Sequence, residues 1–270
     1  MITYKTFIFE AIGTFVVMFY GMMAVERDDQ NNIRDHTRSA IARGLSLAVF
    51  VYLSSKMGMR GYFNPMVTFC MMLLGRMSGS NFILHVIVQA VSSIFAGLAI
   101  KLLRPPPVDE FIQGNYPSIN VKISLLTAFF IEVVSTFLFV LAILTARMRK
   151  RSDPFYTAVV SCGVVATIKF AFGEATGGMV NPISLFGPPL VDGNLFQRGW
   201  WVFWAGSLVG AIPAVYFTHI YLESRSPNRF LKNMEAGFTK DPRENESPVM
   251  ITYGLPSLEN SIDLNTPKAR

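Results

Sequence analysis

Six long apolar runs dominate this sequence of 270 residues. They cover approximately residues 7–24, 39–53, 82–100, 123–146, 157–172 and 199–222. Most of them approach the ~20 residues that a helix needs to cross a bilayer. Charged residues make up 16% of the chain, which is less than a soluble domain of this length carries. The runs therefore predict an all-α membrane protein with six spans and with both termini on the same side.

Basic residues predict the orientation of these spans. The connection between the fourth and fifth runs reads RMRKRSD and begins at Arg147. Short cytoplasmic loops carry an excess of Lys and Arg, so we expect this loop and both termini to be cytoplasmic. The net charge of +6 then reflects topology rather than nucleic-acid binding. Ser152 follows the basic run as in a kinase substrate, although topology alone accounts for that run.

A repeat relates the two halves of the chain. FEAIGTFVVMF begins at residue 9, and IEVVSTFLFVL begins at residue 131. This alignment pairs Glu10 with Glu132. We expect a channel domain over 1–222, with repeat one at about 4–104 and repeat two at about 121–222. The remaining segment, 223–270, is polar and is predicted to be a flexible cytoplasmic tail.

The two repeats are predicted to be inverted relative to each other. Asn64-Pro65 follows the second run, and Asn181-Pro182 follows the fifth. Each half contains three spans, so the second half must enter the membrane from the opposite side. An inverted 3+3 repeat of this kind places its functional site near the midplane, where the halves meet.

Each Asn-Pro pair is typical of a helix start inside the membrane. Asn is a preferred N-cap residue, and Pro is favoured at the first helical position. We therefore expect short half-helices at about 66–74 and from 183 onward. Their N-termini would carry partial positive charge to the midplane and repel cations there, and the Asn amides would donate hydrogen bonds to a passing oxygen. An ordinary loop cap is the alternative interpretation of either pair alone.

The two glutamates are expected to support these half-helices. Non-helical backbone at membrane depth needs hydrogen-bond partners, and buried carboxylates at Glu10 and Glu132 would accept bonds from its N–H groups. Charged residues inside spans are rare and usually functional. The alternative, a chance polar residue near a helix end, does not explain why the pair is repeated.

These features together resemble the aquaporin, or major intrinsic protein, family. The resemblance covers about residues 4–222 and includes TGGMVNP, FGPP, ARGLSLAV at 42–49 and the sixth apolar run. It implies six transmembrane helices, two re-entrant half-helices and a homotetramer with one pore per subunit. The midplane residues that it implies are Asn64, Pro65, Met66, Asn181, Pro182 and Ile183.

The sequence departs from the family pattern at positions that matter for selectivity. The family motif is Asn-Pro-Ala twice, whereas the third positions here are Met66 and Ile183. The arginine that follows the second motif is replaced by Ser184, and the aspartate of most glycerol channels by Leu185.

The resemblance also implies an outer selectivity filter of four residues. Its members would be Arg43, Lys169, Gly178 and Ser184, with Gly44 in place of Arg43 if the count runs back from Asn64. Arg43 and Lys169 could snorkel to the headgroups. Alternatively, the cation that guards the filter has moved from the loop to the helices, and its charge restores the barrier to cations.

We expect a passive channel for water, with glycerol or another small neutral solute as the alternative. An anion pore, a secondary transporter with inverted repeats and a non-conducting structural protein are less favoured alternatives. The sequence shows no nucleophile–base pair, nucleotide-binding loop or metal-ligand cluster, so we expect neither an enzyme nor a cofactor or metal. The predicted partners are the solute, the lipid bilayer and further copies of the chain, in the plasma membrane rather than an internal one.

Overall fold

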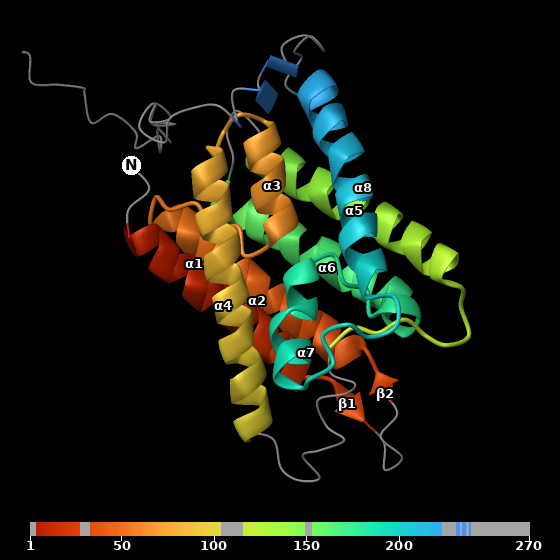
Figure 1. Cartoon of the computed structure of the whole chain (residues 1–270). Helices are drawn as coiled ribbons and strands as arrows, with labels where there is room; N and C mark the ends of the chain where they lie inside the picture. The colour runs from red at the N-terminus through yellow and green to blue at the C-terminus, as the bar shows by residue number, and fades with distance from the viewer. Residues whose placement is uncertain are drawn as a thin grey trace, which may run out of the picture.

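The computed structural model describes residues 4–27, 33–103, 116–148 and 153–222, together with five residues of the tail, namely Leu231, Lys232, Met234, Glu235 and Phe238. The predictions about Ser152 and about the rest of the tail lie outside these residues. The described chain is a bundle of long helices around two short central ones (Figure 1).

The long helices match the six apolar runs. They are α1 (Tyr4–Met23), α2 (Thr37–Lys56), α4 (Gly79–Leu103), α5 (Leu125–Met148), α6 (Pro154–Thr176) and α8 (Trp200–Phe217), which continues into the π-helical turn η3 (Thr218–Leu222). Two short strands, β1 (Glu26–Arg27) and β2 (Ile33–Asp35), form an antiparallel pair between α1 and α2.

Five of the described helices are long and apolar enough to cross a membrane, namely α1, α4, α5, α6 and α8 with its extension to Ile220. Helix α2 has the same length as α1, but Arg38 and Arg43 lower its mean hydropathy. Apolar side chains such as Ile12, Val49 and Phe95 are exposed on the outside of the bundle. This exterior suits lipid, because a soluble protein rarely exposes such extensive apolar surface.

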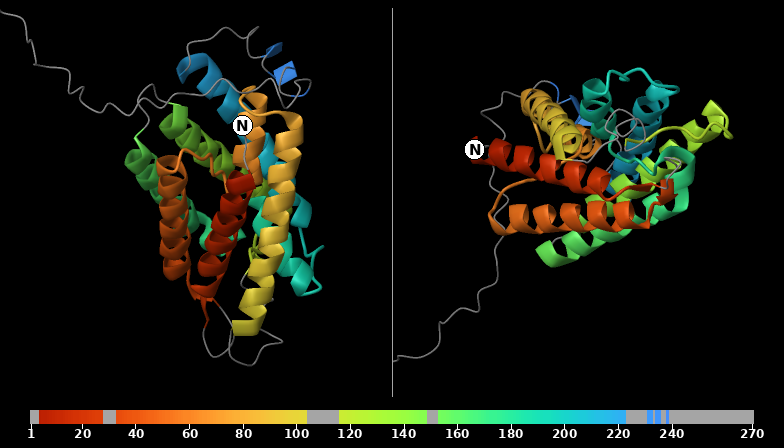
Figure 2. Two further views of the ribbon diagram at one scale, coloured as in Figure 1. Left: turned by 90° about the vertical axis from the view of Figure 1, so that its left-hand side faces the viewer. Right: turned by 90° about the horizontal axis from the view of Figure 1, so that it is seen from below.

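The packing follows the predicted repeat. Helix α1 packs on α4 in the first half, and α5 packs on α8 in the second. Helices α2 and α6, the middle helices of the two halves, pack directly on each other, and α1 and α2 run side by side (Figure 2). Gly210 allows close packing of α8 on α5, because a Cβ atom there would overlap the Val133 carbonyl. The bundle is an inverted repeat of three helices plus three.

The two central helices enter from opposite ends of the bundle. The first is α3 (Pro65–Leu73), and the second is a 3₁₀ helix, η2 (Pro182–Leu185), followed by α7 (Gly187–Val191). Figure 1 shows α3 in the upper part of the bundle and α7 in the lower part, and α3 contacts η2 between them.

The second half-helix is broken, which the sequence did not predict. Gly187 packs so closely on α4 that a Cβ atom would overlap the Ser93 backbone, and its N–H donates to the Ser93 hydroxyl (3.1 Å). Pro188 and Pro189 follow, and neither has an N–H to continue the hydrogen-bond ladder. The helix therefore restarts at Gly187 instead of continuing from η2.

Candidate functional site

The two Asn side chains form a reciprocal contact at the centre of the bundle. Asn64 Oδ1 accepts the N–H of Met66 (2.8 Å), and Asn181 Oδ1 accepts that of Ile183 (3.3 Å), so each caps its own half-helix. Asn64 Nδ2 donates to the Val180 carbonyl (2.8 Å). Asn181 Nδ2 donates to the Phe63 carbonyl (2.9 Å). Each amide nitrogen carries two hydrogens, so one N–H of each amide remains for another acceptor.

The residues that supply these carbonyls adopt an unusual backbone conformation. Phe63 has φ +54° and Val180 has φ +42°, and they are the non-glycine residues with positive φ in the described chain. Such strain persists only where the surroundings hold it. The Phe63 ring is held over Gly13, where a Cβ atom would overlap it, and it contacts the rings of Phe9 and Phe50.

The carboxylate of Glu10 supports the first Asn-Pro segment. It is fully buried and accepts the backbone N–H groups of Tyr62 (2.8 Å) and Phe63. Gln89 Nε2 also donates to it (2.6 Å) and reaches the Thr68 hydroxyl (3.1 Å). The carboxylate thus ties α1, α3 and α4 to the residues before Asn64.

Glu132 occupies the equivalent position in the second half but is bonded differently. It is also fully buried, beside the Thr176 hydroxyl and the backbone amides of Met179 and Val180. Among the described residues, neither of its oxygens forms a hydrogen bond of good geometry, and the Thr176 hydroxyl is unpaired as well. The second segment is therefore held less tightly than the first.

Arg43 reaches from α2 to the second half-helix. Its side chain is 4% exposed, and Nη1 donates to the Ser184 hydroxyl (3.1 Å). Gly44 instead faces α6, because a Cβ atom there would lie 3.0 Å from the Cys162 carbonyl oxygen. The structure thus brings Arg43, and not Gly44, to Ser184. This inward position favours the relocated cation over a snorkelling arginine.

Lys169 lies on α6, close to Arg43. It is 4% exposed, and Nζ donates to the Gly177 carbonyl (2.9 Å) at the end of the same helix. Its charge interacts with those of Arg43 and Glu132. Gly178 has φ +57° and packs on α6, where a Cβ atom would lie 2.6 Å from the Lys169 Cα. The four predicted filter residues therefore gather at the same end of the bundle.

Two further residues shape this end of the bundle, and the sequence reading missed both. The Ser184 hydroxyl donates to Met18 Sδ (2.8 Å) on α1. Gly21, one turn further along α1, lies against the arginine, since a Cβ atom there would be 2.7 Å from Arg43 Nε. A glycine within an apolar helix was the available signal, because it marks a close approach.

Arg147 contacts the first Asn-Pro segment from α5. Its Nη2 donates to the Gly61 carbonyl (2.6 Å), and its guanidinium lies over the Tyr62 ring at 5.5 Å from the centroid. From the sequence, Arg147 was interpreted only as a signal of topology. The structure shows that it also holds the loop that leads to Asn64.

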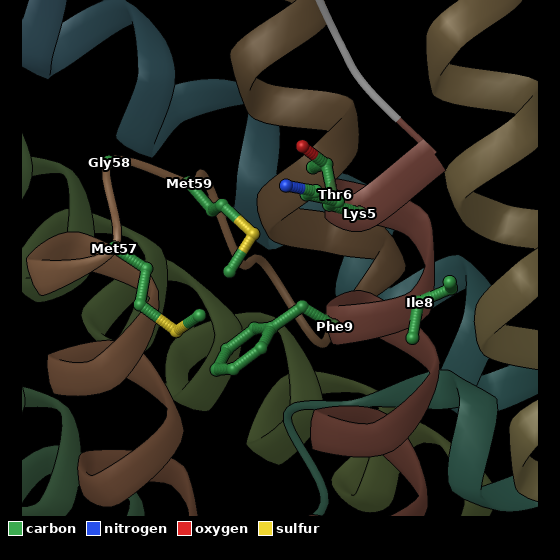
Figure 3. A pocket seen from close by; sticks show the side chains of 7 residues that line it. All are labelled: Lys5, Thr6, Ile8, Phe9, Met57, Gly58 and Met59. Carbon is green, nitrogen blue, oxygen red and sulfur yellow. The ribbon is translucent and has the colours of Figure 1, made fainter.

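A cavity of about 520 Å³ opens at the end of α2 opposite Arg43. Figure 3 shows the Phe9 ring pointing from α1 toward Met57 and Met59, with Lys5 on the neighbouring turn of α1. The Phe9 ring contacts that of Phe63. The cavity therefore ends one aromatic ring away from the first Asn-Pro segment.

The loops at the opposite end are braced by side chains. The Tyr116 hydroxyl donates to Asp192 (2.9 Å) and accepts from Asn194 (2.9 Å). Partial burial raises the pKa of Asp192 above its usual value, although the Tyr116 bond favours the ionised form. Arg198 donates to three carbonyls between 119 and 123. These bonds fix the loops around the predicted filter residues.

Comparisons with known proteins agree with this arrangement. The sequence profile described as Major intrinsic protein matches residues 1–218. The chain belongs to the major intrinsic protein family. It is therefore a membrane channel of that family.

Relatives within the major intrinsic protein family include proteins named for different solutes. The chain is 30% identical to Aquaporin-2 of Botryotinia fuckeliana, over 78% of this chain and 57% of that protein. It is 26% identical to Glycerol uptake facilitator protein-like 6 of Lactiplantibacillus plantarum, over 80% and 97% of the two chains. Thus the chain spans little more than half of the fungal relative.

The aquaglyceroporin of Plasmodium falciparum has a similar solved structure. The TM-score is 0.71 at 21% sequence identity, and the match covers 82% of this chain and 97% of that one. This similarity supports the fold: six long helices and two half-helices in an inverted repeat.

Proposed function

We propose that this protein is a passive water channel that excludes protons and other ions. The reciprocal contact of Asn64 and Asn181 is the main support for this proposal. Each amide is fixed by a helix cap and by a carbonyl of the other half. Each keeps one N–H for a water oxygen, and the N-termini of the half-helices disfavour cations at the same place.

The residues at the outer end of the bundle favour the permeation of water over that of larger solutes. Ser184 and Gly178 have small side chains, which alone would leave a wide filter. The Arg43 guanidinium, however, lies beside Ser184 and donates a hydrogen bond to its hydroxyl, which supports a narrower filter. Met18 lies on another side of Ser184, where its sulfur accepts a hydrogen bond from the same hydroxyl.

Glycerol is the second candidate. One relative is named as a glycerol uptake facilitator, and the similar solved structure is an aquaglyceroporin. A flexible arginine could move aside for a polyol more easily than a rigid backbone could. Leu185, in contrast, departs from the glycerol-channel pattern described above.

Stopped-flow light scattering of proteoliposomes separates these functions. We expect protein-containing vesicles to shrink faster than protein-free vesicles in a sucrose gradient. In a glycerol gradient, both kinds of vesicle should re-swell at the same slow rate. Equal acceleration in both gradients would establish the glycerol function, and no acceleration in either would indicate a non-conducting protein.

An isosteric variant tests the role of the amide. Asn181→Asp keeps the oxygen that caps Ile183 but replaces the N–H donor with a negative charge, so water permeability should fall and cation leak should rise. Asn120→Asp is the matched control, because Asn120 also accepts a backbone N–H two residues on and donates to a carbonyl, but on an exposed loop. Equal effects of the two substitutions would contradict the proposed role.

We further propose the orientation and assembly of the channel. The basic loop that begins at Arg147 supports cytoplasmic termini, and the cavity above Phe9 would then be the cytoplasmic mouth. The exposed apolar helix surfaces allow both lipid and subunit contacts, and we propose a homotetramer in the plasma membrane. Cross-linking in native membranes and protease access to the tail in sealed vesicles test these assignments.

A further inference from the structure

The outer end of the bundle contains two buried cations close together. Arg43 and Lys169 come from neighbouring helices, each is 4% exposed, and their charges repel each other. Arg43 bonds to a hydroxyl and Lys169 to a carbonyl, both of which are uncharged. Neither bond neutralises a charge.

Hydrogen-bond donors remain unused on both side chains. A guanidinium and an ammonium have more N–H groups than these single bonds occupy. Arg43 Nε is buried and has no partner among the described residues. A buried cation is costly unless it is paired, and an acceptor that carries negative charge would offset this cost.

The nearby carboxylate does not meet this need. Glu132 interacts with Lys169 electrostatically, but its oxygens face the Thr176 hydroxyl and the backbone amides of the second Asn-Pro segment. One carboxylate cannot balance two cations. The cluster thus keeps excess positive charge at the outer filter.

We propose that the outer filter binds one small monovalent anion, such as chloride, between the Arg43 guanidinium and the Lys169 ammonium. The replacement of the loop arginine by Ser184 leaves only a hydroxyl beside Arg43, and a halide is close to water in size. Since water would pass the same point, the bound anion obstructs the water path. This inference rests on the proposed function, and anion concentration then regulates permeability.

The water permeability of proteoliposomes in chloride and in gluconate tests the inference. Gluconate is much larger than chloride, so it serves as the reference anion at equal ionic strength. We expect water permeability to fall as the chloride concentration rises and to level off once the site is full. About half of this fall should be reached at the concentration at which the site is half occupied. Equal permeability in the two anions at every concentration would overturn the inference.

Substitutions assign the effect to the two cations. Lys169→Gln and Arg43→Gln should each weaken the chloride dependence and shift its midpoint to higher concentration. Lys122→Gln is the matched control, because it removes a cation from an exposed position of the loop between α4 and α5. An unchanged chloride midpoint in folded Lys169→Gln and Arg43→Gln would contradict the assignment.

A measurement that does not depend on water flux separates this inference from the proposed function. Chloride should raise the thermal unfolding temperature of the purified protein relative to gluconate, because a ligand that binds the folded state stabilises it. The rise should disappear in Lys169→Gln and persist in Lys122→Gln. Vesicles without water permeability in gluconate would refute the proposed function, whereas the absence of the thermal shift would refute the anion site alone.

Discussion

The two buried glutamates are equivalent in the repeat, but the structure predicts unequal consequences when they are replaced. Glu10 accepts two backbone N–H groups and the Gln89 amide. Glu132 accepts no hydrogen bond of good geometry among the described residues. Replacing each by Gln changes neither length nor shape and removes one negative charge in both variants, so the two variants differ mainly in the bonds that are lost.

The magnitude follows from the donors that face Glu10. A Gln side chain has one oxygen and one amide nitrogen, so one carboxylate oxygen becomes a donor that faces another donor. An unsatisfied buried polar group costs about 1–3 kcal/mol, and bonds to a charged group are worth more than neutral ones. We expect Glu10→Gln to lower the free energy of unfolding by about 3 kcal/mol or more and Glu132→Gln to lower it by at most about 1 kcal/mol.

Thermal unfolding in detergent, followed by circular dichroism, measures the difference. By the scaling for soluble domains, a loss of about 3 kcal/mol corresponds to roughly 6–12 °C in the unfolding temperature. Water permeability should fall in parallel for Glu10→Gln, because the residues before Asn64 lose their support. An equal or larger loss in Glu132→Gln would refute the reasoning from hydrogen bonds.

Two further predictions concern residues that the sequence reading missed or assigned differently. Gly163→Ala should stabilise α6 by about 1 kcal/mol through helix propensity, because a Cβ atom there meets open space. Gly21→Ala should lack this gain, because its Cβ would lie 2.7 Å from Arg43 Nε. For the same reason, Gly21→Ala should alter the proton leak of proteoliposomes. Similar thermal shifts and leaks in both variants would argue against a positioning role for Gly21. Arg147→Met should lower the free energy of unfolding by about 2–4 kcal/mol, because a charged hydrogen bond and a cation–π contact are lost. Lys122→Met, which removes an exposed cation, should change it by no more than about 0.5 kcal/mol.

The fold was largely predictable because its signals are local. Apolar runs of membrane length and the two Asn-Pro caps each act over a few residues, and the repeated glutamates are visible by comparing the two halves. The predicted architecture is confirmed by the structure and the family. The break at Gly187 was not predictable, because it depends on contact with Ser93 on another helix. The repeat boundaries stay a prediction.

The candidate site was predictable as a set of positions but not as a set of contacts. Counting residues along the sequence left Arg43 and Gly44 as alternatives. A helix turns by about 100° per residue, so only the packing of α2 shows which of the two faces the predicted filter. The bond from Asn64 to Val180 joins segments 116 residues apart. The missing bonds at Glu132 depend on how its oxygens are placed relative to Thr176, Met179 and Val180, which the sequence does not encode.

We propose that Arg43 on α2 and Lys169 on α6 replace the arginine of the second motif as the barrier to cations. The most direct test measures water permeability and proton leak in the same proteoliposomes, for the wild type and for Arg43→Ala combined with Lys169→Ala. We expect the double variant to conduct water still but to leak protons or other cations. A folded, water-conducting double variant with unchanged ion leak would contradict it.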